Sequence, residues 1–174
     1  LDGVADLLGL PARRVAVVAE REERKVAPLL RMAREQLEGR RIAVLADTPR
    51  AAGLVAAAQE CGMTPTLVGL LDDALGGEAA FAETLVSLDQ GLPDHCPLLP
   101  SPTAPELAAA VDRPPDVLVA PDLWLPPALS DGVPRVEMGL PANRKRALWA
   151  TPELGWNGLV ALAQRLLDAV NRVH

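Results

Sequence analysis

Two apolar segments joined by a helix constrain the fold of this chain most strongly. Residues 42–46 (Ile-Ala-Val-Leu-Ala) form a continuous apolar run, which is typical of a parallel strand that is buried on both faces of a sheet. Residues 47–49 (Asp-Thr-Pro) are a helix start, because a side-chain oxygen acceptor stands just before a proline. An alanine-rich helix that ends at Gly62 and a second strand at Thr64–Leu70 complete a βαβ unit, which should be right-handed.

The rest of the chain continues this alternation of helices and strands. A short helix-like start closed by Gly9 and Pro11 precedes a charged helix that begins near Glu20 and stops at Gly39, with Pro28 either kinking it or opening a second helix. The pattern predicts helices over 78–88 and 104–111 and strands over 116–120 and 133–138. It predicts a proline-rich loop through residue 102 and another loop around residues 124–127. A last helix carries one apolar stripe, made of Leu159, Leu162, Ala163, Leu166, Leu167, Val170 and Val173.

The predicted fold class is α/β, a Rossmann-like, doubly wound, short parallel sheet of four or five strands with helices on both faces. Residues 1–40 are an N-terminal helical lead-in, and residues 41–174 are the Rossmann-like domain. The first residue is leucine rather than an initiator methionine, so we expect the chain to have been cut from something longer.

Composition excludes several classes of function. The chain has 174 residues and a net charge of −6, which argues against nucleic acid as a partner because phosphate binding needs a concentrated basic surface. The one basic cluster, Arg144–Arg146, is interpreted as the solvated tip of a loop. No uncharged apolar run approaches the eighteen or so residues that cross a bilayer, and no signal peptide is evident, so no membrane role is expected.

Cysteine usage predicts a cytoplasmic protein with reduced thiols. Cys61 and Cys96 are the only cysteines, and they stand far apart with no further ligand at metal spacing. His95 and Cys96 are adjacent, but two neighbouring ligands do not complete a four-coordinate site, so this pair is interpreted as part of a surface loop. We therefore predict no metal site.

No catalytic constellation is evident in the sequence. The turn after residue 46 lacks the glycine fingerprint of dinucleotide sites, and Asp47 would repel a phosphate there. Asp72–Asp73 and Asp89 are interpreted as solvated turn residues, and no catalytic residue is predicted. Asp47 and Asp122 follow strands, at the edge where α/β domains bind ligands, so they are the candidate cofactor or interface contacts; helix capping is the favoured role for Asp47.

Three segments together resemble the carboxy-terminal domain of nitrogenase component 1-type subunits. The first runs from the charged helix at Glu20-Arg21 through Gly39-Arg40-Arg41 and the strand ending in Asp47, and it continues as the turn Cys61–Pro65. The second is the Pro-Asp strand Pro115–Val119. The third, Val133–Pro141 followed by Gly155–Leu159, is similar to the "Ile-Pro-Leu-x-Arg-x-Gly-Phe-Pro … Gly-Tyr-x-Gly" ending of β-type subunits.

The sequence also departs from the family pattern. The segment after the second strand is Ala120–Trp124 where β-type subunits carry a Gly-Asn-Ser-like turn, and Leu140 and Trp156 replace a phenylalanine and a tyrosine. The cofactor-binding histidine of α-type subunits has no counterpart, because Pro152–Leu154 stand before Gly155. The resemblance therefore favours a β-type or assembly-scaffold member.

The resemblance implies a function that depends on other domains. It implies the carboxy-terminal domain of a nitrogenase-like β-type subunit in iron–molybdenum cofactor biosynthesis for nitrogen fixation, with no chemistry in this part of the chain. The expected partners are a paralogous α-type subunit in an α2β2 heterotetramer and an ATP-dependent iron–sulfur reductase, and the iron–sulfur cluster is expected in the full-length complex. One alternative is a subunit of dark-operative protochlorophyllide reductase, which Glu60–Met63 resembles; another is a stand-alone α/β binding module.

Overall fold

A computed structural model describes residue 7 and residues 9–72, 76–122, 125–139, 152 and 155–172. Within these residues the chain forms a five-stranded sheet in the order β3-β2-β1-β4-β5, and every neighbouring pair is parallel. The strands are β1 (Arg41–Ala46), β2 (Thr64–Leu70), β3 (Leu98–Pro100), β4 (Val117–Ala120) and β5 (Arg135–Glu137). The predicted α/β class with a short parallel sheet is confirmed.

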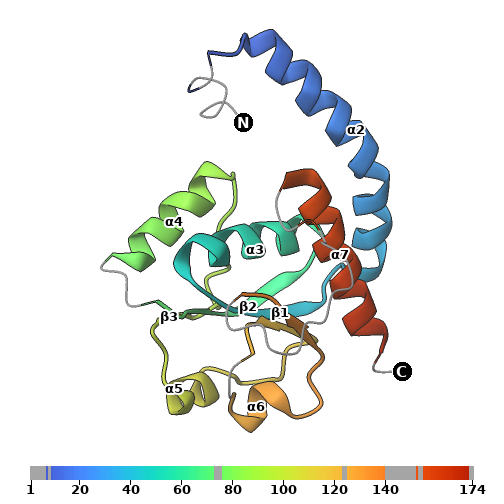
Figure 1. The fold of residues 1–174 in the computed structure, drawn as a ribbon. Coiled ribbons are helices and arrows are strands. Elements are labelled where there is room, and N and C mark those ends of the chain that lie inside the picture. Colours follow the sequence, from blue (N-terminus) through green and yellow to red (C-terminus); the bar gives the residue numbers. More distant parts are fainter. Residues whose placement is uncertain are drawn as a thin grey trace.

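Helices cover both faces of the sheet (Figure 1). One face carries the longer helices α3 (Thr48–Glu60), α4 (Gly77–Ser87) and α7 (Gly155–Asn171), and α2 (Ala12–Leu37) packs on α7. The other face carries the short helices α5 (Ala104–Ala109) and α6 (Pro127–Ser130). No helix in the described ranges combines the length and the apolarity that crossing a bilayer requires.

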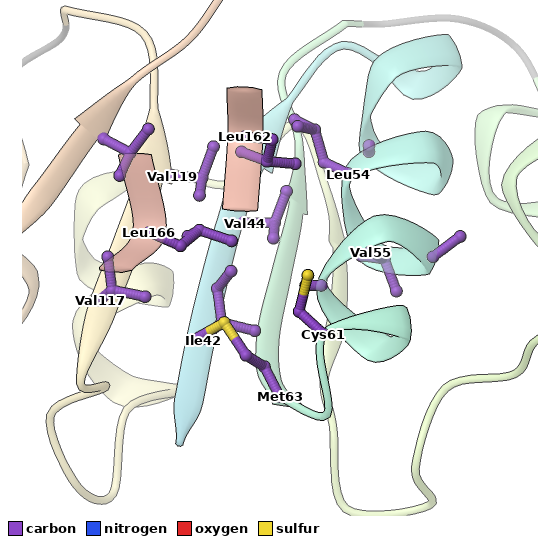
Figure 2. Packing of buried hydrophobic residues seen from close by; sticks show 14 of the residues in the cluster. Ile42, Val44, Leu54, Val55, Cys61, Met63, Val117, Val119, Leu162 and Leu166 are labelled. Carbon is purple, nitrogen blue, oxygen red and sulfur yellow. The ribbon is translucent and has the colours of Figure 1, made fainter. Parts of the chain in front are cut away.

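The core has two parts because the strands are buried on both faces. Ile42 and Val44 of β1 point to one face, where they meet Val117 and Val119 of β4 and Leu166 of α7 (Figure 2). The alternate residues of β1, Ala43 and Leu45, belong to the smaller cluster under α5 and α6. Both clusters exclude water, which explains why β1 reads as an uninterrupted apolar run rather than an alternating one.

Gly69 of β2 shows how closely the layers pack. A Cβ atom added at this position would lie 2.6 Å from Cδ2 of Leu45 and 3.2 Å from Cγ of Pro102. A side chain there would force the side chain of Leu45 to shift and would crowd Pro102, so close packing favours glycine in the middle of the sheet.

The proline-rich segment before residue 102 contains a strand, so its prediction as a loop was wrong for residues 98–100. Leu98–Pro100 pairs with Val68–Leu70 as the edge strand β3, and the carbonyl of Pro97 accepts a hydrogen bond from the backbone N–H of Val68 at 3.0 Å. Proline lacks a donor but keeps its carbonyl, and an edge strand needs partners on one side only. This is why three residues flanked by prolines complete the sheet.

The lead-in is one continuous helix. α2 begins at Ala12, with Pro11 at its N-cap position, and runs through Pro28 to Leu37, so neither a start near Glu20 nor a second helix at Pro28 is found. Pro28 is exposed, as is Arg24 four residues earlier, so water can reach the carbonyl that loses its helical donor. A second correction concerns residues 127–130, which form the short helix α6 where a loop was predicted.

Candidate functional site

The carboxyl edge of the sheet holds both predicted contact residues. The strand order reverses between β1 and β4, because the chain leaves β1 towards β2 on one side while β4 lies on the other. Val44 pairs with Val119 across these strands. Asp47 and Asp122 each stand three residues beyond that pair, so the structure brings them to the same level of the crevice where open α/β sheets bind ligands.

Asp47 does not cap α3 with its side chain, so the favoured capping role was wrong. It occupies the N-cap position in an extended conformation, yet it makes no side-chain cap hydrogen bond. Its Oδ1 atom lies 3.7 Å from Nε of Arg50, one turn along the helix, and both side chains are about half exposed. Asp47 therefore pairs with Arg50 rather than with the backbone of the helix.

Asp72 caps α3 from the next strand. Its Oδ1 atom accepts a hydrogen bond from the Thr48 hydroxyl at 2.6 Å and another from the Thr48 backbone N–H at 3.0 Å. The hydroxyl bond is the main reason why the pKa of the Asp72 carboxyl lies below its ordinary value, and the backbone bond adds to it. Asp72 was predicted to be a solvated turn residue, and the structure shows that it caps α3 instead. The sequence signal for this role is an acid directly after β2, because β2 ends at the edge of the sheet where α3 begins.

This capping decides what the crevice can bind. The N-terminus of a helix is the usual position for a phosphate in this fold, but here a carboxylate of the protein already satisfies the first N–H of α3. Asp47, Asp72 and Asp122 surround the same edge. Arg50 reaches across it, with Nη1 3.8 Å from the position of a Cβ on Gly139 after β5. The edge therefore disfavours a nucleotide phosphate, in agreement with the missing glycine fingerprint.

The two thiols lie in the hydrophobic core. Cys61, at the end of α3, is fully buried, and Cys96, before β3, is 8% exposed. Desolvation raises the pKa of each thiol to about 11, so both are protonated at neutral pH. The prediction of a surface loop holds for His95, which is exposed, and was wrong for the side chain of Cys96.

Metal-ligating side chains do not converge in the described part of the chain. Among those residues no group of three histidine, cysteine, aspartate or glutamate side chains is placed to hold a metal ion. Several residues discussed above lie outside the described residues: Asp73, Trp124, Leu140, Arg144–Arg146, Glu153 and Val173.

A cavity of about 570 Å³ opens at the opposite, amino edge of the sheet. Its lining includes Arg41, His95 and Cys96. Arg41 is held in place by its neighbours: its guanidinium donates to the carbonyls of Arg113 and Pro114, and its backbone N–H donates to Asp116 at 2.6 Å. These bonds fix the start of β1 to the start of β4, which is a structural role.

The comparisons with known proteins identify the family. The model of the nitrogenase component 1 type oxidoreductases matches residues 1–171. The chain belongs to this family. The predicted resemblance is therefore confirmed, and the parallel sheet described above is the sheet of a nitrogenase component 1 type domain.

Solved structures agree on the fold. A structure described as nitrogenase Cp1 at pH 6.5 superposes with a TM-score of 0.73 at 16% identity, covering 98% of this chain and 36% of that chain. Nitrogenase Cp1 at pH 5 gives a TM-score of 0.64 at 13% identity, covering 92% and 36%. This chain thus spans 36% of the length of these structures. No curated protein matches it.

Proposed function

We propose that this chain is the carboxy-terminal domain of a β-type subunit of a nitrogenase-like complex and that its role is structural. The observation that carries the proposal is the family match over residues 1–171 together with a span of only 36% of the solved nitrogenase chains. A domain of that share, with both cysteines buried in its core, suits a subunit whose iron–sulfur cluster is bound by cysteines of another domain.

The finer part of the proposal concerns the pathway. The favoured role is a scaffold in iron–molybdenum cofactor biosynthesis, in a cytoplasmic α2β2 heterotetramer with a paralogous α-type subunit that receives electrons from an ATP-dependent iron–sulfur reductase. The sequence supports it through the β-type ending and through Pro152–Leu154, which stand where α-type subunits carry their cofactor-binding histidine.

A second candidate is a subunit of dark-operative protochlorophyllide reductase, favoured by the segment Glu60–Met63. Within this segment Cys61 and Met63 are buried, and Gly62 has a φ of +77°. A Cβ at Gly62 would lie 3.1 Å from Cγ of Arg34 and 3.2 Å from Cα of Glu38. Packing against α2 thus requires this turn. The same packing requirement would keep such a segment in either branch of the family.

The experiment that separates these candidates is anaerobic purification of the full-length protein with the product of the neighbouring gene. We expect a complex that contains iron and sulfide, and a molybdenum-cofactor precursor after loading. Specific binding of a tetrapyrrole instead would support the second candidate. A complete gene of this length, with no upstream cysteines and no iron in the purified complex, would overturn both in favour of a stand-alone binding module.

A further inference from the structure

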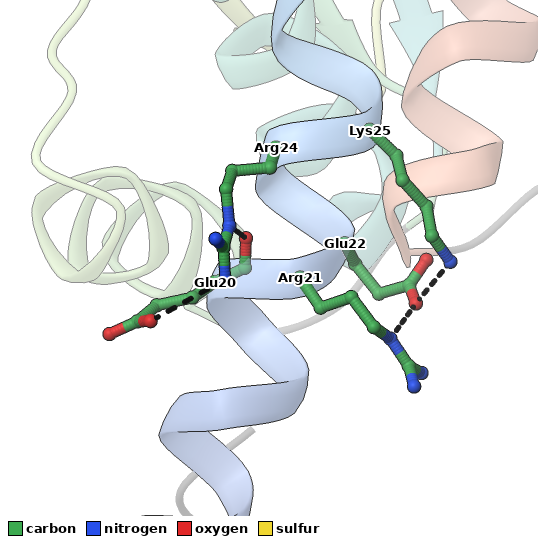
Figure 3. Close-up of polar contacts among 5 residues, drawn as sticks. All are labelled: Glu20, Arg21, Glu22, Arg24 and Lys25. Atoms are coloured by element: carbon green, nitrogen blue, oxygen red, sulfur yellow. Dashed lines mark hydrogen bonds and ion pairs between the residues drawn. The ribbon is translucent and has the colours of Figure 1, made fainter.

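We draw no further inference here: the strongest candidate, the exposed apolar patch at Val17 and Val18 on the first half of α2, just before the ion pairs of Glu20 and Glu22 (Figure 3), carries nothing, because this chain spans 36% of the solved nitrogenase chains and nothing in the structure shows what covers the patch.

Discussion

The two halves of helix α2 differ in burial although they belong to one uninterrupted helix. Leu37, near its C-terminal end, is fully buried, whereas Val17, near its N-terminal end, is 57% exposed. The difference does not come from residue type, because both side chains are apolar. It comes from what lies opposite: α7 packs on one face of the second half, and Figure 1 shows no described element against the first half.

The same contrast separates the domain body from its lead-in. The strands of the body are buried on both faces, and the Thr48–Asp72 bonds hold the start of α3 to the end of β2. Within the described residues the body is packed on both faces of the sheet, while the first half of α2 presents exposed apolar side chains such as Val17 and Val18.

The largest expected effect compares the two ends of α2 directly. Leu37→Ala should lower the free energy of unfolding by about 2–5 kcal/mol, because it leaves a cavity in the core. Val17→Ala should change it by less than about 0.5 kcal/mol, because Val17 is 57% exposed. Urea denaturation followed by circular dichroism measures both. Equal losses would mean that the first half of α2 is packed as well as the second.

A second comparison places the same substitution in the sheet and on the surface of α3. Gly69→Ala should lower the free energy of unfolding by about 1–3 kcal/mol, because the new Cβ would lie 2.6 Å from Leu45. Gly53→Ala, in open space on α3, should raise it by about 0.5–1 kcal/mol, because alanine favours the helix. Thermal denaturation of the two variants gives the sign of each change. A neutral Gly69→Ala would show that the layers are looser than described.

The smallest stability effect concerns the capping of α3. Asp72→Ala removes both bonds to Thr48 and should lower the free energy of unfolding by about 1 kcal/mol at pH 7. Asp47→Ala should cost less, because Asp47 makes no cap bond and its side chain and that of Arg50 are each about half exposed. Chemical denaturation at pH 7 ranks the two variants. A larger loss for Asp47→Ala would reverse their assignment.

Asp72 also gives the protein a specific dependence on pH. Its pKa is lowered in the folded state, so its contribution is complete above the ordinary pKa of about 4 and is lost as the pH falls through the lower folded value. The difference in stability between the wild type and Asp72→Asn should therefore shrink below about pH 4. A difference that stays constant down to pH 2 would show that the Asp72 charge does not stabilise the fold.

Much of the sheet could be predicted from the sequence because its strands are buried on both faces. Such strands leave continuous apolar runs, and Thr64–Leu70 was predicted with the bounds that the structure has. β3 left no such run, since three residues at an edge need few apolar neighbours, and its prolines indicated a loop. Pro28 indicated a break in α2, but exposure of that turn to water lets the helix continue.

The candidate site was predictable in position and not in detail. A strand followed by an acid indicated the edge at Asp47 and Asp122, because parallel strands end on the same side. Which acid caps α3 depends on the reach of Asp72 from a neighbouring strand to Thr48, and sequence spacing does not contain that distance. Burial of Cys96 beside an exposed His95 likewise follows from the path of the chain into β3.

The central claim is that this domain supplies structure and contact surface while cluster chemistry belongs elsewhere in the subunit. The most direct test is the iron and sulfide content of the 174-residue chain after anaerobic cluster reconstitution. We predict no stoichiometric cluster, because cluster ligands must be thiolates and burial holds the pKa of Cys61 and Cys96 at about 11. A stoichiometric cluster that is lost in Cys61→Ser or Cys96→Ser would contradict the account.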